Sequence, residues 1–244
     1  MSLVGQLLSV AALSHSQRRR MYGLMDQHYV NVQPETFEAD LAEKQWVILL
    51  TDPVTDELCG FSTQRLLTVE ANGVAVTALF SGDTIIARDK WGESALPHVW
   101  GQLALSLIDE HSEGPLYWFL ISKGYKTYRF LPLFFREFYP RYDRATPREA
   151  RTIIDALAGS RWADLYDSCA GVIRATAAKD RLRPGIADVT DARLRDAHVR
   201  FFRDQNPGFA DGDELCCLAP LTRDNFTPAA WRVIGAAPGE RGVA

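Results

Sequence analysis

The chain has 244 residues, of which 47% are hydrophobic and 24% are charged. This composition is sufficient for a sizeable buried core and excludes extensive disorder. The formal net charge of −4 gives no electrostatic reason to expect binding to duplex nucleic acid or to an anionic membrane surface. No apolar stretch has the length of a membrane span, and the positive cluster near the start follows its apolar run, which is the wrong order for a secretory signal.

Two helices are predicted near the start of the chain. Ser14 and Gln17 have capping-box spacing, and apolar residues from Met21 to Tyr29 recur on one helical face. Pro34 suits the first turn of a second helix, where acidic residues complement the positive helix end.

The hydrophobic period then changes to that of strands. Three apolar runs, at 45–52, 59–70 and 74–87, are separated by turn sequences, the second of which is Asn72-Gly73. They predict a three-stranded antiparallel meander. Gly82 interrupts the third run, which indicates a bulge or a close approach of another group to the backbone.

A long helix is predicted from Ser94, its expected cap, to about residue 110, followed by a strongly apolar strand at 115–122. Residues 126–142 have the pattern of a helix interrupted near Pro132.

The composition shifts after residue 145. Thr146 and Glu149 have capping-box spacing and predict a helix to Gly159. Helical segments are expected near 161–180 and 190–203, and the apolar piece 214–221 is a candidate strand.

The cysteines and histidines do not suggest a metal site. Cys59, Cys169, Cys216 and Cys217 lack the paired spacing of a zinc site, and the five histidines lack metal-type pairing. Cys216 and Cys217 are adjacent, so in a strand they face opposite sides and are expected to be buried. A reduced, cytoplasmic setting is the expectation.

The order of elements from about Leu8 to Tyr142 resembles the GNAT acyltransferase superfamily. The resemblance implies an α+β fold with a mixed, mainly antiparallel sheet flanked by helices. We assign residues 1–145 to this GNAT-like domain and residues 146–244 to a mostly helical extension that packs on it.

Within the stretch SGDTIIARDKWGES, residues 81–94, the part from Arg88 to Ser94 occupies the place of the turn whose amides bind the pyrophosphate of acyl-CoA in that family. Unpaired amides at a helix start attract phosphate oxygens. The match to the family pattern is incomplete, and the alternative is that Gly92 only turns the chain and Ser94 only caps the helix. The resemblance implies the following donor-binding residues: Ser81, Arg88, Lys90, Trp91, Gly92, Ser94 and Lys123.

Basic and aromatic residues alternate over 122–130. This pattern suits adenosine phosphates, the phosphopantetheine of a carrier protein, or an RNA donor, and the alternative is a solvated helix start.

The family often uses a tyrosine to protonate the leaving thiolate. Phe135 stands at the usual tyrosine position here, so Tyr139 and Tyr128 are the candidates that remain open, with aromatic packing as the alternative. For the base, the family often uses a carboxylate or a water chain near the middle of the strand before this turn, and Asp83 lies there. A carboxylate in apolar surroundings has a raised pKa, which suits this role, and a residue that bonds its own bulge is the alternative.

The resemblance therefore implies transfer of an acyl group from a thioester, acetyl-CoA or another acyl-CoA, to an amine of a small molecule. An acyl carrier protein or aminoacyl-tRNA as donor, or a GNAT-like binding module without catalysis, are the alternatives. The acceptor, the acyl chain and the oligomeric state are not specified by the sequence.

Overall fold

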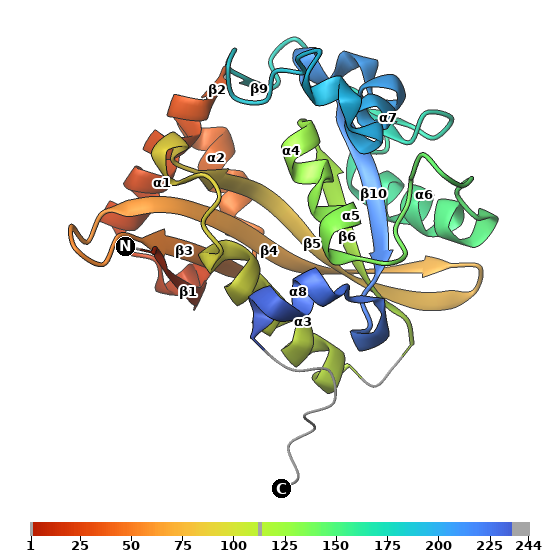
Figure 1. Ribbon diagram of the computed structural model, residues 1–244, viewed down its shortest axis with the longest axis horizontal. Helices are drawn as coiled ribbons and strands as arrows, with labels where there is room; N and C mark the ends of the chain where they lie inside the picture. Colours follow the sequence, from red (N-terminus) through yellow and green to blue (C-terminus); the bar gives the residue numbers. More distant parts are fainter. Residues whose placement is uncertain (1, 112–113, 236–244) are drawn as a thin grey trace, which may run out of the picture.

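The computed structural model describes residues 2–111 and 114–235. An eight-stranded sheet runs through the molecule in the order β1-β3-β4-β5-β6-β10-β8-β7 (Figure 1). Its pairings are antiparallel except that of β5 with β6. The strands are β1 (Val4–Ser9), β3 (Trp46–Thr51), β4 (Leu58–Ala71), β5 (Val74–Ile86), β6 (Leu116–Ser122), β7 (Tyr166–Asp167), β8 (Val172–Ile173) and β10 (Glu214–Pro220). The predicted mixed, mainly antiparallel sheet flanked by helices is confirmed.

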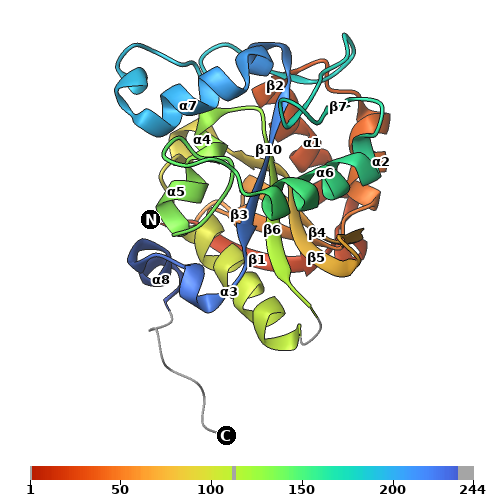
Figure 2. The same ribbon diagram turned by 90° about the vertical axis from the view of Figure 1, so that its right-hand side faces the viewer.

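Helices cover both faces of this sheet (Figures 1 and 2). Two apolar clusters pack α1, α2 and α6 on one face, and a third packs α3, α5, α7 and α8 on the other. The helices are α1 (His15–His28), α2 (Pro34–Ala42), α3 (Ala95–Glu110), α4 (Tyr125–Tyr128), α5 (Phe130–Phe134), α6 (Arg148–Trp162), α7 (Ala197–Gln205) and α8 (Pro228–Ile234). A separate two-stranded ribbon pairs β2 (Tyr29–Val30) with β9 (Arg181–Leu182).

The local signals in the first part of the chain are confirmed. The capping box of Ser14 and Gln17 starts α1, Pro34 begins α2, and the meander β3-β4-β5 turns at Asn72-Gly73, both in the left-handed region. Strand β1 was not predicted, because its residues are half exposed at the sheet edge and lack a clear alternation.

Ser94 stands at the N-cap of α3, as predicted, although its side chain accepts no capping hydrogen bond. Two predicted helices differ in extent from those in the structure. Residues 126–142 form only the short helices α4 and α5, because the chain is extended from Phe135 onward and its backbone bonds to Leu218 and Asn225 instead. Helix α6 begins after Pro147 without a side-chain cap and continues past Gly159 to Trp162.

The prediction of helix over 161–180 is also wrong. The strands β7 and β8 lie there, because Gly171 takes a φ of +69° and the carboxylate of Asp167 accepts from two peptide nitrogens in the turn between them. The candidate strand at 214–221 is confirmed as β10, which lies between β6 and β8. Cys216 and Cys217 are buried on opposite faces of it, as predicted.

Candidate functional site

The strands β5 and β6 separate part of the way along their length. Their parallel pairing runs from Thr77 and Leu116 to Ser81 and Leu120 and then stops, although β5 continues to Ile86. On the other side of β5, a bulge sets Gly82 and Asp83 opposite the single residue Thr63. The Gly82 irregularity predicted from sequence is therefore confirmed, and a gap opens beside it.

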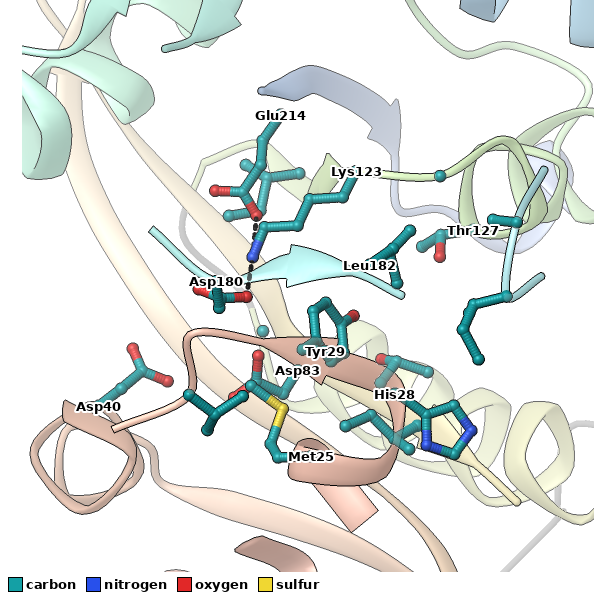
Figure 3. Close-up of a pocket in the computed structure, with 18 of the residues that line it drawn as sticks. Met25, His28, Tyr29, Asp40, Asp83, Lys123, Thr127, Asp180, Leu182 and Glu214 are labelled. Atoms are coloured by element: carbon teal, nitrogen blue, oxygen red, sulfur yellow. Dashed lines mark hydrogen bonds and ion pairs between the residues drawn. The ribbon is translucent and has the colours of Figure 1, made fainter. Parts of the chain in front are cut away.

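A cavity of about 390 Å³ occupies this gap. Its walls come from β5 and β6, from the end of α1 through α2, from the turn before α3, from the end of α6, and from residues 178–187 (Figure 3). The bulge places Asp83 on the face covered by α1 and α2, whereas Leu96 lies on the α3 face. The cavity thus passes between the two strands from one face of the sheet toward the other.

The turn before α3 presents peptide nitrogens without partners. Gly92 has a φ of +98°, and both Gly92 and Leu96 line the cavity. The amides of Trp91 and Glu93 donate to the backbone carbonyls of Arg88 and Lys90. Four other amides have no hydrogen-bond acceptor among the described residues: those of Gly92, Ser94, Ala95 and Leu96. This end of the cavity can therefore donate hydrogen bonds to an anion.

The acidic side chain of Glu93 does not oppose an anion in the cavity. Its carboxylate accepts from the hydroxyl of Ser2 and the amide of Leu3, on the outside of the turn. These hydrogen bonds hold the pKa of Glu93 below its ordinary value.

The predicted donor-binding residues are only partly brought together. Trp91, Gly92 and Lys123 line the cavity. Arg88 and Ser94 are exposed outside it, and the guanidinium of Arg88 donates to the carbonyl of Pro184 at 3.4 Å. The remaining two lie away from the lining: Lys90 pairs with Asp52 at 2.9 Å, and buried Ser81 bonds with Gln64, Trp100 and Trp118.

Asp83 is partly buried in the cavity wall. Among the described residues its carboxylate has no hydrogen-bond or ion-pair partner. Burial and the neighbouring Asp40 raise the pKa of Asp83 to about 6, against the opposing effect of Lys123 and Lys44. A carboxylate with this pKa can accept a proton near neutral pH.

The candidate acids Tyr128 and Tyr139 lie outside the cavity. The hydroxyl of fully buried Tyr128 donates to the carbonyl of Pro140 at 2.9 Å, and burial raises its pKa far above the ordinary value. The hydroxyl of Tyr139 donates to Glu137, and burial followed by this bond raises its pKa to about 12. Phe135 is buried against Trp100 and Trp118 and also lies outside.

Tyr29, at the end of α1, is the tyrosine that the structure places in the cavity. Burial, Asp83, Asp180 and Glu214 raise its pKa strongly, so it remains a neutral phenol. Its hydroxyl points away from Asp83, toward the side where Leu182 lies (Figure 3). No local pattern marks Tyr29 as a site residue, since the pairing of β2 with β9 that holds it joins segments more than 150 residues apart.

Lys123 is bound in a buried ion cluster (Figure 3). Its ammonium bonds to Asp180 and lies 3.6 Å from Glu214, and Lys179 lies 3.5 Å and 3.7 Å from the same two carboxylates. Burial lowers the pKa of Lys123, but the two carboxylates outweigh it and the pKa is raised. The charge of Lys123 thus holds residues 179–180 against β6 and β10.

A further group of side chains lines the inner end of the cavity beside Asp83. Lys44 bonds to Asp40, and Arg161 bonds to Glu43 and stacks with its guanidinium carbon 5.3 Å from the Trp162 ring. His28 lines the cavity elsewhere, on the opposite side of Tyr29 from Asp40 (Figure 3). Its buried Nε2 has no hydrogen-bond partner among the described residues, and its Nδ1 is 2.8 Å from the carbonyl of Leu24.

No group of three or more His, Cys, Asp or Glu side chains is arranged to hold a metal ion within 2–111 and 114–235. Within the same ranges, no helix combines the length and the apolar character needed to cross a membrane.

Comparison with protein-family models and with curated proteins gives no match. Among solved structures, the chain is similar to a probable N-acyltransferase from Enterococcus faecalis, with 15% identity, a TM-score of 0.40, and 52% of this chain and 31% of that chain covered. It is also similar to a GCN5-related N-acetyltransferase from Kribbella flavida (10%, TM-score 0.40, 56% and 34%). A third similar structure is an acetyltransferase from Trypanosoma brucei (14%, TM-score 0.39, 59% and 99%).

The chain thus spans about a third of the length of the first two of these proteins and nearly all of the third.

Proposed function

We propose that this protein transfers an acyl group from a thioester, acyl-CoA, to the amine of a small molecule. The observation that supports the proposal most is a single cavity with unpartnered amides at the Gly92 turn and an unpartnered carboxylate at Asp83, joined through the gap between β5 and β6. An elongated donor with a negatively charged handle and a neutral reactive end fits these two features.

The donor end of this cavity is also electropositive. The ammonium of Lys126 lies 3.3 Å from the centre of the Trp91 ring. Burial lowers the pKa of Lys126, and the nearby cations Arg193 and Arg88 lower it further. None of these three cations has a carboxylate within ion-pair distance among the described residues. They and the amides of the Gly92 turn would hold the phosphates of the donor.

The chemical step is then a direct attack. The amine forms a bond from nitrogen to the thioester carbonyl carbon, and Asp83 accepts the proton that the nitrogen loses. The bond from carbon to sulfur breaks, and the sulfur leaves as a thiolate that Tyr29 stabilises by donating a hydrogen bond. Because its pKa is raised, Tyr29 keeps its own proton, and solvent protonates the sulfur after release.

The experiment is to mix the purified protein with acetyl-CoA and a panel of small amines and to measure release of free thiol. We expect release that depends on both the protein and an amine. Binding of acetyl-CoA without release would instead indicate a binding module, and failure of acetyl-CoA to bind would remove the proposal.

A further inference from the structure

The charged side chains at the inner end of the cavity are mostly committed to one another. Lys44 bonds to Asp40, and Lys123 and Lys179 are held by Asp180 and Glu214. These groups therefore have little capacity left for a ligand.

Two groups of opposite charge keep such capacity. The carboxylate of Asp83 has no partner, and the guanidinium of Arg161 uses only its Nη2, which bonds to Glu43. Its Nη1 has no hydrogen-bond partner among the described residues. A charged donor left open in the wall of a cavity favours a ligand oxygen at this place.

Phe80 limits how far apart the two groups can lie. The guanidinium carbon of Arg161 lies 5.9 Å from the centre of the Phe80 ring, and Asp83 follows Phe80 by three positions in β5. A strand advances by about 3.3 Å per residue, so Asp83 lies within roughly 10 Å of Phe80 along the strand. The rings of Phe80 and Trp162 line the cavity beside Arg161 and suit an apolar linker.

We propose, on the basis of the function proposed above, that the acceptor is an amine that also carries a carboxylate a few carbons away. Its amine lies at Asp83 and its carboxylate at Arg161, with the carbon chain against the two aromatic rings. A simple alkylamine leaves the Arg161 donor unpartnered in a site from which water is displaced. A diamine places a second positive charge against Arg161 and Lys44 and is rejected by repulsion.

Three four-carbon compounds separate these cases: γ-aminobutyrate, butylamine and putrescine. The charge-assisted hydrogen bond to Arg161 is expected to raise kcat/KM for γ-aminobutyrate about 10- to 100-fold above that for butylamine, with putrescine lowest. Calorimetric titration of the free protein with γ-aminobutyrate and with butylamine gives the same order without turnover.

The variant Arg161→Gln is expected to bring the ratio between γ-aminobutyrate and butylamine close to one. Arg65→Gln is the matched control, because Arg65 also pairs with Glu43, at 3.0 Å, but does not line the cavity. It is expected to keep the ratio. Arg161→Lys, which keeps the charge and loses the fork of donors, is expected to give an intermediate ratio and serves if Arg161→Gln does not fold.

The outcomes distinguish the two proposals. Thiol release with all three amines at similar kcat/KM overturns the carboxylate proposal and leaves the acyltransferase proposal standing. Absence of release with every amine, together with calorimetric binding of γ-aminobutyrate that depends on Arg161, overturns the acyltransferase proposal and leaves the carboxylate-binding role of Arg161 standing. Preference for putrescine overturns the carboxylate proposal outright.

Discussion

The two ends of the cavity are built in different ways. The end at the Gly92 turn is made of consecutive residues, because β5, the turn and the start of α3 follow one another in the chain. The inner end brings together side chains from α2, β5, β6, α6 and the segment before β9. The first presents mainly backbone amides and unpaired cations, whereas the second presents mainly side chains in buried ion pairs. Under the proposed function, anchoring and chemistry would therefore fall to separate parts of the fold.

The strongest test of this division is the removal of the Asp83 charge. Asp83→Asn keeps the shape of the side chain and cannot accept the proton, so kcat is expected to fall by about 10²- to 10⁴-fold. In the wild type, kcat/KM is expected to rise with pH through about 6, where Asp83 loses its proton, and this rise should vanish in the variant. Steady-state assays across pH measure both; an unchanged profile would remove Asp83 from the chemistry.

The same variant has a stability signature. Because burial raises the pKa of Asp83 in the folded state, its protonated form favours the fold at low pH, and this contribution is lost as pH rises through about 6. Above this pH, Asp83→Asn should therefore melt at a higher temperature than the wild type. Below the pKa that Asp83 has in the unfolded chain, it should not. A variant that is equally destabilised at every pH would contradict the burial of this charge.

The second largest effect is expected in the ion cluster. Lys123→Met leaves Asp180 and Glu214 buried without their principal cation and should lower the free energy of unfolding by about 3–5 kcal/mol. Arg223→Gln, which breaks the exposed pair with Asp109, should change it by no more than about 1 kcal/mol. Denaturant unfolding measures both, and equal losses would show that Lys123 holds nothing together.

Tyr29→Phe tests the hydrogen bond to the leaving sulfur and should lower kcat about tenfold. The effect is expected to be smaller than that of Asp83→Asn, because a thiolate leaves readily without a full proton transfer. Tyr139→Phe removes a hydroxyl outside the cavity and is the control. A larger loss in Tyr139→Phe than in Tyr29→Phe would reverse this assignment and restore the acid predicted from the sequence.

The smallest effect is expected at the turn. Gly92 and Gly73 have φ values of +98° and +74°, and an added Cβ meets nothing within 4 Å at either. Alanine at each should cost roughly 1–2 kcal/mol of stability through backbone strain. Only Gly92→Ala should also raise the KM for acetyl-CoA, by a few-fold, since Gly92 lines the cavity proposed for the donor and Gly73 does not. Equal KM values in both variants would place the donor elsewhere.

The same contrast explains what the sequence could predict. The capping box of Ser14, the turn at Asn72-Gly73 and the irregularity at Gly82 are set by neighbouring residues, and each is present. The short strands β7 and β8 exist only because β10 pairs beside them, so a local pattern indicated helix. The prediction that residues 1–145 form a domain with 146–244 as an extension remains a prediction, although β10 from the second range lies within the main sheet.

The site follows the same rule. Asp83 and Gly92 were found because a strand, a bulge and a turn mark them in sequence, and the structure places both in the cavity. Tyr29, Arg161 and Asp180 were not found, because they reach the cavity only through long-range packing and their own segments carry ordinary helix and loop signals. The tyrosines Tyr128 and Tyr139 were named as candidates for their proximity in sequence, and burial in aromatic clusters keeps them away.

The most direct test of the central claim is a calorimetric titration of the wild type and of Asp83→Asn with acetyl-CoA. If the open amides after Lys90 hold the donor while Asp83 performs the chemistry, both proteins should bind one equivalent with similar affinity, and only the wild type should then release thiol on addition of an amine. The account would be contradicted if acetyl-CoA failed to bind to the wild type.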